Sequence, residues 1–317
     1  MRILQIDKYF YDHGGSSRVF LDTIEGFRAR GEEVAEFAMQ DPRNKSSVFA
    51  RYFTPAAPEL ESDLSKVDLF KAFKHRFFSG EVDRRLSALV ADFRPDLAHI
   101  HNAYGQASAS VFLTLNQLRV PIVLTLHDPF PLCPNPVEKL EEYYYGLRIW
   151  KHIRLFICPS EFMAKKMVEA GFPKEKMRVI RNPFPLPAHC PPPGTEVVYL
   201  EKSHDKKDLN KAKVVVVPAN CHENCSFDIL EAQSQGRIVV APRGGGHLEF
   251  IIDGESGFLY RADEPESLAA TVQKALSLTD EKASKIIERS RQLVLRDHNL
   301  DQYFRLLREV YEEALRH

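Results

Sequence analysis

Glu223-Asn224-Cys225-Ser226-Phe227-Asp228-Ile229-Leu230-Glu231 is the stretch that decides the fold, because it sets two carboxylates eight positions apart across the start of a predicted helix. An apolar run, 214–217, precedes it and predicts a strand that ends at Pro218. A second predicted strand, 238–241, and a glycine turn, 244–246, follow it. This order of elements predicts the ligand-binding edge of a dinucleotide-type α/β sheet. Carboxylates at such an edge accept hydrogen bonds from hydroxyl groups of a sugar or a ribose, so we expect an activated sugar as the ligand.

The composition describes a globular chain with room for two domains. The 317 residues are 44% hydrophobic and 27% charged, and no run approaches the roughly 20 apolar residues of a membrane-spanning helix. A formal net charge of −1 argues against nucleic acid as a partner. The first residues predict a strand instead of a signal peptide, and five cysteines, an odd number, favour a reducing compartment. We therefore expect a cytoplasmic protein.

Cys221, His222 and Cys225 lie close together in the sequence, as zinc ligands do. A second pair at a normal ligand interval is missing, so we interpret them as small side chains buried beside the cleft. We expect neither a metal nor a cofactor at the site.

The first half of the chain alternates predicted strands with helices or loops, which predicts a mostly parallel sheet covered on both faces. The first predicted helix follows Ser16 or Ser17, either of which can cap it, and it buries Phe20, Ile24 and Phe27. The runs that predict strands are 3–6, 33–39, 97–101, 122–126, 156–158 and 178–180.

A proline-rich segment divides the chain, since six of the residues from 181 to 194 are prolines and neither a helix nor a central strand tolerates them. The sequence therefore predicts a first Rossmann-like lobe, 1–183, a linker, 184–194, and a second Rossmann-like lobe, 195–296. Runs rich in leucine and charge, 268–278 and 301–315, predict helices. We expect the terminal segment, 297–317, to be a helix that packs back on the first lobe.

A glycine loop follows the first predicted strand, at the edge where open α/β sheets bind ligands. Gly14 and Gly15 lie in it, just before the first predicted helix. Glycines there let a ligand approach the backbone closely, and a helix N-terminus offers N–H groups to an anion. A phosphate-binding loop and a plain tight turn both fit the pattern.

Three histidines lie in or directly after two other predicted strands of the first lobe. His127 follows the strand 122–126, and we expect it to point into the cleft. His101 and Asn102 are assigned to the acceptor side of the cleft. His99 is two residues before His101 and shares its face of the strand, and we expect a structural role for it.

The segment Phe70–Phe78 combines aromatic and basic side chains at helical spacing. Its phenylalanines form one stripe, and its lysines and arginine lie elsewhere around the helix. An amphipathic helix packed on the first lobe explains this pattern best. A surface for anionic lipid or a lipid-linked acceptor is the alternative, and it implies peripheral contact with the inner face of the membrane.

These motifs, taken in order, resemble the large family of retaining glycosyltransferases with the GT-B fold, of the family-4 type. The resemblance runs from Met1 to about Pro187 and again from about Val197 to the end. It implies an α/β protein of two Rossmann-like lobes. The matching motifs are Gly14-Gly15, Thr125-Leu126-His127-Asp128, Cys133-Pro134, Pro159-Ser160-Glu161, Arg181-Asn182-Pro183, the stretch 223–231, Gly245-Gly246, Glu249 and Asp253-Gly254.

The resemblance implies transfer of a sugar from a nucleotide diphosphate sugar to a hydroxyl acceptor, with the anomeric configuration retained. Gly14 and Gly15 then approach the donor diphosphate or the acceptor. His127 contacts the transferred sugar near its reacting carbon and Glu223 holds sugar hydroxyls, so these two are the catalytic candidates.

The resemblance implies that the second lobe binds the nucleotide part of the donor. Glu231 holds the nucleotide ribose, and backbone N–H groups near Ser226 and Phe227 face the phosphates. Helix ends and positive side chains, instead of a metal, stabilise the departing nucleotide diphosphate. The acceptor is a glycan or a lipid-linked molecule.

The second lobe departs from the family pattern. Only about 30 residues separate the prolines from Glu223, and roughly 70 to 80 residues that we expect from the family and from ordinary domain size are absent. We therefore predict a lobe that has lost its first strand–helix units, together with the arginine and lysine that clamp the diphosphate. Lys202 and Lys207 have the spacing of that clamp, but a solvated basic turn explains them better because lysine lacks the fork of arginine.

Two alternatives follow from this departure. The chain is either a weakened transferase or a catalytically silent protein, natural or engineered, that binds glycan or nucleotide or serves only as a folded scaffold. A third possibility is that another chain restores the missing elements, since a shortened sheet leaves an exposed edge that invites pairing and oligomerisation.

Overall fold

The computed structural model describes residues 1–56, 75–102, 108–128, 149–187, 190–200, 209–218 and 227–316. Contacts divide the chain into two compact units. The first comprises Met1–Cys158, Lys166–Val179 and Phe304–His317, and the second comprises Pro159–Lys165 and Ile180–Tyr303. Both are α/β, as the sequence predicts, and the lobe boundaries at 183, 194 and 296 stay predictions.

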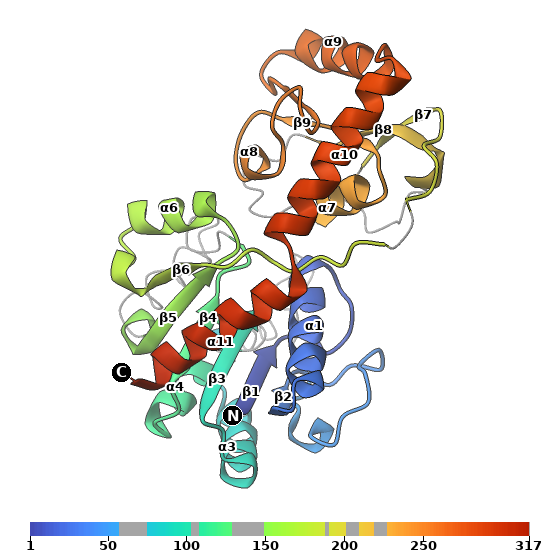
Figure 1. Ribbon diagram of the computed structural model, residues 1–317. Helices are drawn as coiled ribbons and strands as arrows, with labels where there is room; N and C mark the ends of the chain where they lie inside the picture. Colours follow the sequence, from blue (N-terminus) through green and yellow to red (C-terminus); the bar gives the residue numbers. More distant parts are fainter. Residues whose placement is uncertain are drawn as a thin grey trace, which may run out of the picture. The chain divides into compact units, whose positions relative to one another are not determined.

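The first unit is built on a six-stranded sheet in which every pair of neighbours is parallel (Figure 1). The strand order is β2-β1-β3-β4-β5-β6. The apolar runs of the sequence become these strands because both faces of a parallel sheet are buried. Their bounds are β1 Arg2–Asp7, β2 Glu33–Phe37, β3 Leu97–Asn102, β4 Ile122–Thr125, β5 Ile153–Cys158 and β6 Met177–Val179.

Helices cover this sheet, and the last helix of the chain is one of them (Figure 1). The ring of Phe304 in α11 lies 5.1 Å from that of Phe27 in α1. Gly26 makes room for it, because a Cβ there would lie 1.9 Å from the Phe304 ring. The helices are α1 Gly15–Ala29, α3 Gly80–Phe93 and α4 Ser110–Gln117, with short 3-10 turns at Ala50–Tyr52, Trp150–His152 and Lys174–Lys176. Two further helices, α6 Glu161–Glu169 and α11 Leu300–Arg316, begin with residues of the second unit and end with residues of the first.

The start of α1 corrects one expectation. The helix begins at Gly15, after Gly14, and no side chain caps it. Ser17 does not act as the cap but lies inside the first turn, where its hydroxyl accepts from the backbone N–H of His13 and donates to the carbonyl of Gly14. Gly14 adopts φ 138°, a conformation that favours glycine, and this starts the helix earlier than the serines predicted.

The second unit has a four-stranded sheet within its described residues, again with every pair parallel and in the order β10-β9-β8-β7. Buried side chains form a core on each face of it. The strands are β7 Glu196–Tyr199, β8 Ala212–Val216, β9 Ile238–Pro242 and β10 Phe258–Tyr260. The helices are α7 Phe227–Ser234, α8 His247–Phe250, α9 Pro265–Leu276 and α10 Asp280–Asp297, and a 3-10 turn spans Leu209–Lys211.

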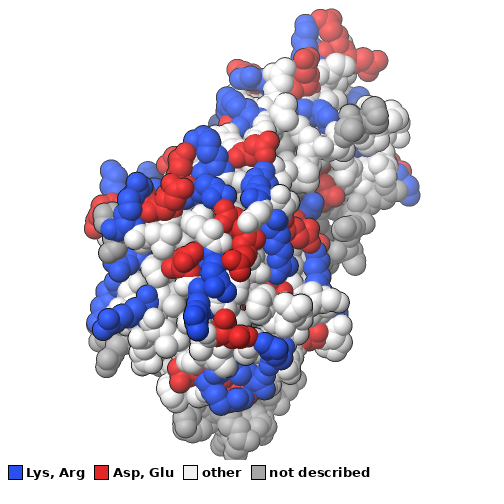
Figure 2. Space-filling model, turned by 60° about the horizontal axis from the view of Figure 1, so that its bottom comes forward, with Lys and Arg blue, Asp and Glu red and all other residues white. Residues whose placement is uncertain are grey.

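The surface carries charges of both signs. On the face drawn in Figure 2, lysines and arginines alternate with aspartates and glutamates, so this face presents no field of a single sign to a polyanion. Within the described ranges, no helix is both long and apolar enough to cross a membrane. Of the segment 70–78, residues 70–74 lie outside the described ranges, and Phe78 is exposed.

Candidate functional site

The carboxyl ends of β1, β3 and β4 bring several predicted site residues to one edge of the first sheet. Asn102 ends β3 beside Asp7, its partner in register at the end of β1. His127 comes two residues after β4. The ring of Phe20 in α1 lies 5.5 Å from that of His101, so the helix that follows Gly14 and Gly15 reaches the same edge. Open α/β sheets bind ligands at this edge.

A continuous row of hydrogen bonds runs beneath this edge, and we call it the histidine chain. Its six members come from β1, β3, β4, the residues after β4, and α11. Thr125 Oγ1 lies 2.7 Å from His99 Nε2, and His99 Nδ1 lies 2.7 Å from Tyr311 Oη. The bonds continue from Tyr311 Oη to Gln5 Nε2 at 3.0 Å, from Gln5 Oε1 to His101 Nε2 at 3.0 Å, and from His101 Nδ1 to His127 Nε2 at 3.1 Å.

The strand register explains why these side chains meet. His99 and His101 are two residues apart in β3, so they point to the same face of the sheet. Gln5 is the register partner of His99, and neighbouring partners in a parallel sheet also share a face. Gln5, His99, His101 and Tyr311 are fully buried, whereas His127 is partly exposed. The histidine chain therefore reaches solvent at its His127 end.

Desolvation by the surrounding protein keeps the three histidines neutral. Desolvation lowers the pKa of His99 and of His127 to about 3, with a smaller lowering of the His99 pKa by the nearby His127. Desolvation also lowers the pKa of His101 well below its ordinary value, and its two histidine neighbours add to this effect. A neutral imidazole donates through one nitrogen and accepts through the other. At neutral pH these rings can therefore pass hydrogen bonds along but carry no charge.

Asp7 adds a buried carboxyl group to the same edge. Its Oδ1 accepts from the backbone N–H of Tyr9 at 3.1 Å, and within the described part of the chain its Oδ2 has no hydrogen-bond partner. Burial raises the pKa of this carboxyl to about 7. Asp7 can therefore be protonated near neutral pH and can then donate a hydrogen bond.

Aromatic rings border the glycine loop. The ring of His13 lies 4.5 Å from that of Tyr9 and 5.6 Å from that of Tyr11. His13 is exposed and Tyr9 is half-buried. Aromatic faces next to a ligand-binding edge provide apolar surface for a ring-shaped ligand.

In the second unit the glycine turn follows the carboxyl end of β9, and Glu231 lies in α7, the helix that comes after β8 along the chain. Glu231 is half-buried in α7 and accepts a long hydrogen bond, 3.5 Å, from the side chain of Gln235. Phe227 is the first residue of α7. The turn after β9 contains Gly245 at φ 59°, which favours glycine.

Glu249, which follows the glycine turn, holds the start of α6. Its carboxylate accepts from the backbone N–H groups of Glu161 and Phe162 at 3.0 and 2.7 Å, and it forms an ion pair with Arg181 at 3.3 Å. All four residues belong to the second unit. A carboxylate is favourable at a helix N-terminus because of the helix dipole. Three separate motifs of the sequence thus meet at one carboxylate.

Several predicted site residues lie outside the described ranges, namely Glu223, Ser226, Lys202 and Lys207, together with the zinc candidates Cys221, His222 and Cys225. Among the residues that are described, no group of three or more histidines, cysteines, aspartates or glutamates could hold a metal ion.

Sequence reasoning missed three members of the site. Gln5 gives a signal, because it is a polar residue inside an otherwise apolar strand, and Asp7 gives a weaker one at the end of that strand. Tyr311 gives none, since nothing near it in the sequence indicates a partner in β3. His99 is structural in position, as expected, but it also links Tyr311 to Thr125.

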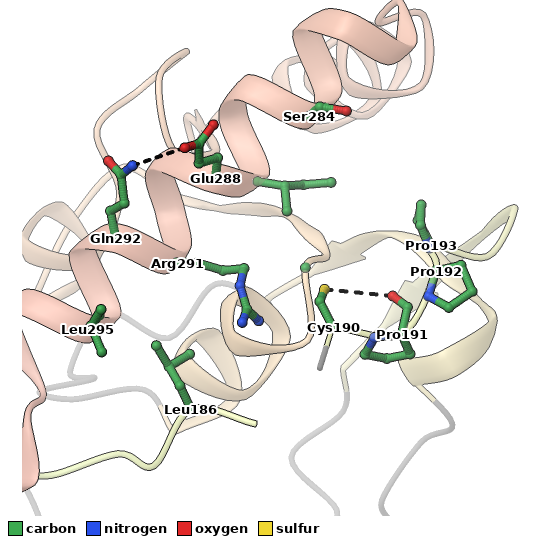
Figure 3. A pocket seen from close by; sticks show the side chains of 12 residues that line it. Leu186, Cys190, Pro191, Pro192, Pro193, Ser284, Glu288, Arg291, Gln292 and Leu295 are labelled. Carbon is green, nitrogen blue, oxygen red and sulfur yellow. Dashed lines mark hydrogen bonds between the residues drawn. The ribbon is translucent and has the colours of Figure 1, made fainter. Parts of the chain in front are cut away.

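A hollow of about 530 Å³ lies elsewhere in the second unit, between the prolines 191–193 and α10 (Figure 3). Cys190, Glu288 and Arg291 are among the residues that line it. Gly236, which also lines it, precedes β9. The hollow is therefore at the amino ends of the strands, the edge opposite to the one where such sheets bind ligands.

Two family models match the chain in succession. Residues 13–186, more than half of the chain, match the family described as Glycosyltransferase Family 4. Residues 197–293 match the family described as Glycosyl transferases group 1. No curated protein matches the chain.

Solved structures of low sequence identity have the same fold. One is Alr3699/HepE from Anabaena in complex with UDP and glucose, with 15% identity, a TM-score of 0.73, and 98% of this chain and 99% of that chain covered. A glycosyltransferase from Rickettsia africae has 15% identity, a TM-score of 0.71 and coverage of 99% and 98%. Sucrose-phosphate synthase from Thermosynechococcus elongatus has 16% identity, a TM-score of 0.71 and coverage of 98% of both chains. At these identities the likeness establishes the fold, two parallel-sheet α/β domains of GT-B type.

Proposed function

Because the chain belongs to Glycosyltransferase Family 4, we propose that it transfers a sugar from a nucleotide diphosphate sugar to a hydroxyl acceptor. The observation that carries the proposal is the position of the motif residues. His101, Asn102, His127 and the glycine loop lie at the carboxyl edge of the first sheet, and the glycine turn follows the carboxyl end of β9 in the second. Ligands of open α/β sheets bind at these edges.

In this proposal the second unit binds the donor. Glu231 accepts hydrogen bonds from the ribose hydroxyls, and the N–H groups near Ser226 and Phe227 at the start of α7 hold the phosphates, where the helix dipole favours negative charge. Glu223 holds hydroxyls of the transferred sugar. Because Alr3699/HepE was solved with UDP and glucose, UDP is the first nucleotide to test as part of the donor.

In this proposal the first unit contacts the anomeric centre of the transferred sugar and the acceptor. His127 hydrogen-bonds the transferred sugar near its anomeric carbon, and Gly14 and Gly15 let the diphosphate or the acceptor approach the backbone. A neutral His127 suits this role because it contributes a directed hydrogen bond without a charge. Asn102 lies on the acceptor side, and the fully buried His101 hydrogen-bonds His127 beneath the edge.

We propose that the transfer retains the anomeric configuration. The bond from the anomeric carbon to the phosphate oxygen breaks while the acceptor oxygen bonds to the same face. The acceptor's proton passes to the departing phosphate oxygen, so atoms and charge balance without a cofactor. Backbone N–H groups at a helix end stabilise the charge that develops on the diphosphate. The reaction takes place in the cytoplasm, at the inner face of the membrane if the acceptor is lipid-linked.

We also propose that the chain binds its donor weakly. Within its described residues the sheet of the second unit has four strands, and this supports the proposal because a small sheet leaves few positions for a diphosphate clamp. Loss of two charge-assisted contacts, at about 1.5–3 kcal/mol each, changes micromolar donor binding to millimolar or weaker. The same observation favours a second candidate, a catalytically silent protein that binds nucleotide or glycan.

Calorimetric titration of the full chain with UDP, GDP and ADP tests the donor site. We expect saturable binding of one nucleotide and binding about tenfold or more weaker in Glu231→Ala, because the ribose loses a charged acceptor. Glu255→Ala, an exposed carboxylate of the same unit, is the matched control and is expected to leave affinity unchanged.

Turnover of the matching nucleotide sugar then separates the two candidates. Release of nucleotide that depends on an added glycan or lipid-linked acceptor supports a transferase, and binding without release supports the silent alternative. No binding of any of the three nucleotides at concentrations well above millimolar would rule out the transferase and would leave a silent protein that binds glycan.

A further inference from the structure

The histidine chain has a direction, which the side-chain amide of Gln5 defines. An amide donates only through its nitrogen and accepts only through its oxygen. Gln5 Oε1 faces His101 Nε2, so His101 carries its proton on Nε2. The neutral His101 ring must then accept through Nδ1, and its partner there, His127 Nε2, must donate. The proton of His127 is therefore on Nε2, and its Nδ1 is an acceptor.

The other end of the histidine chain follows the same logic. Gln5 Nε2 donates to the hydroxyl of Tyr311. With that hydrogen bond accepted, the Tyr311 O–H donates to Nδ1 of His99, and His99 donates from Nε2 to Thr125. Rotating the Gln5 amide by half a turn would reverse every one of these hydrogen bonds and move the His127 proton to Nδ1.

The orientation of the Gln5 amide sets the first direction. Its Nε2 lies 3.0 Å from Tyr311 Oη and its Oε1 lies 3.0 Å from His101 Nε2.

We propose that Tyr311, on the last helix of the chain, is a positioning residue that acts through Gln5 and His101 to hold His127 with its proton on Nε2 and Nδ1 as an acceptor. Tyr311 is fully buried and does not reach the edge itself. The meaning of this tautomer for sugar transfer rests on the proposed function, since Nδ1 of His127 would accept from a sugar hydroxyl. The tautomer itself does not depend on any ligand.

The experiment is proton–nitrogen correlation NMR of the histidine rings in the full chain labelled with ¹⁵N-histidine, near neutral pH and without nucleotide. Spectra of His99→Gln, His101→Gln and His127→Gln assign the three rings. In wild type we expect His101 and His127 each to show a protonated nitrogen coupled to both ring carbon-bound protons, which identifies Nε2–H. We also expect the Nε2–H proton of His127 to exchange slowly with water.

Two variants test whether Tyr311 acts through Gln5. Tyr311→Phe keeps the ring and removes the hydroxyl, and Gln5→Met keeps the length and removes the amide. We expect each to change His127 to a mixture of tautomers with a fast-exchanging ring proton, and the double variant to give the same His127 spectrum as Gln5→Met alone. Tyr303→Phe, a buried tyrosine of the same helix outside the histidine chain, is expected to leave the His127 spectrum unchanged.

Three results would overturn the proposal. His127 or His101 with its proton on Nδ1 in wild type would show the opposite direction, and this needs no variant to fold. An unchanged His127 spectrum in folded Tyr311→Phe would show that the hydroxyl does not act on His127. Equal changes in Tyr303→Phe and Tyr311→Phe would reveal only a general loosening of the helix. If UDP, GDP and ADP all fail to bind, the proposed function fails while the tautomer result still stands.

Discussion

The hydroxyl of Tyr311 lies 2.7 Å from Nδ1 of His99, although 212 residues separate them in the sequence. The first residue is on the terminal helix and the second is in a central strand of the first sheet. The end of the chain therefore completes the polar interior of the unit with which the chain begins.

Acid should destabilise the first unit. His99, His101 and His127 have a folded-state pKa below the ordinary value of 6.5, to about 3 for the first and third, so unfolding below pH 6.5 takes up protons. Stability is then lost as the pH falls below 6.5, and for His99 and His127 the loss continues toward pH 3. Urea unfolding at a series of pH values measures this. A His127→Gln variant should have a shallower slope, and equal slopes would contradict the prediction.

Asp7 should have the opposite effect on stability, which it lowers as the pH rises. Its pKa is raised from 3.8 to about 7, so the stability it contributes when protonated is lost as the pH rises through 7. Asp7→Asn cannot ionise and keeps an oxygen for the N–H of Tyr9. Its stability relative to wild type should therefore increase between pH 4 and pH 8, by up to about 4 kcal/mol. Urea unfolding measures the difference, and Asp12→Asn, at an exposed position, should show no such trend.

Gly26→Ala should destabilise the contact between α1 and α11. The added Cβ would lie 1.9 Å from the ring of Phe304, which must move, and overpacking of this kind typically costs about 1–3 kcal/mol. Gly80→Ala is the matched control, because nothing lies within 4 Å of its Cβ and the residue is in a helix. Urea unfolding should show a loss for the first variant and none for the second. A Gly26→Ala variant as stable as wild type would show that the contact is loose.

Glu249→Ala should weaken the second unit at the start of α6. It removes the acceptor of two backbone N–H groups and one partner of Arg181, and loss of such a cap costs about 0.5–2 kcal/mol. Hydrogen exchange of the amides of Glu161 and Phe162 is the direct measurement, and both should exchange faster. Glu255→Ala should leave them unchanged. Protection that survives Glu249→Ala would mean that another group caps the helix.

Local patterns predicted most of the secondary structure. The six strands of the first sheet correspond to apolar runs, and Phe20, Ile24 and Phe27 are buried in α1 as their spacing indicates. The prediction that Ser16 or Ser17 caps α1 was wrong, because Gly14, with a φ of 138°, allows the helix to begin earlier, at Gly15. The shared edge of His101 and His127 also followed from the sequence, since parallel strands place their carboxyl ends together.

The sequence by itself determined which faces are apolar and which residues end the strands, because side-chain periodicity and apolar burial act over a few neighbouring residues. Only the tertiary structure decided that Gln5, His99 and Tyr311 share hydrogen bonds and that Glu249 holds the start of α6. A hydrogen bond needs two atoms within about 3 Å. For residues many positions apart, the packing of whole helices on a sheet sets that distance, and no local pattern encodes it.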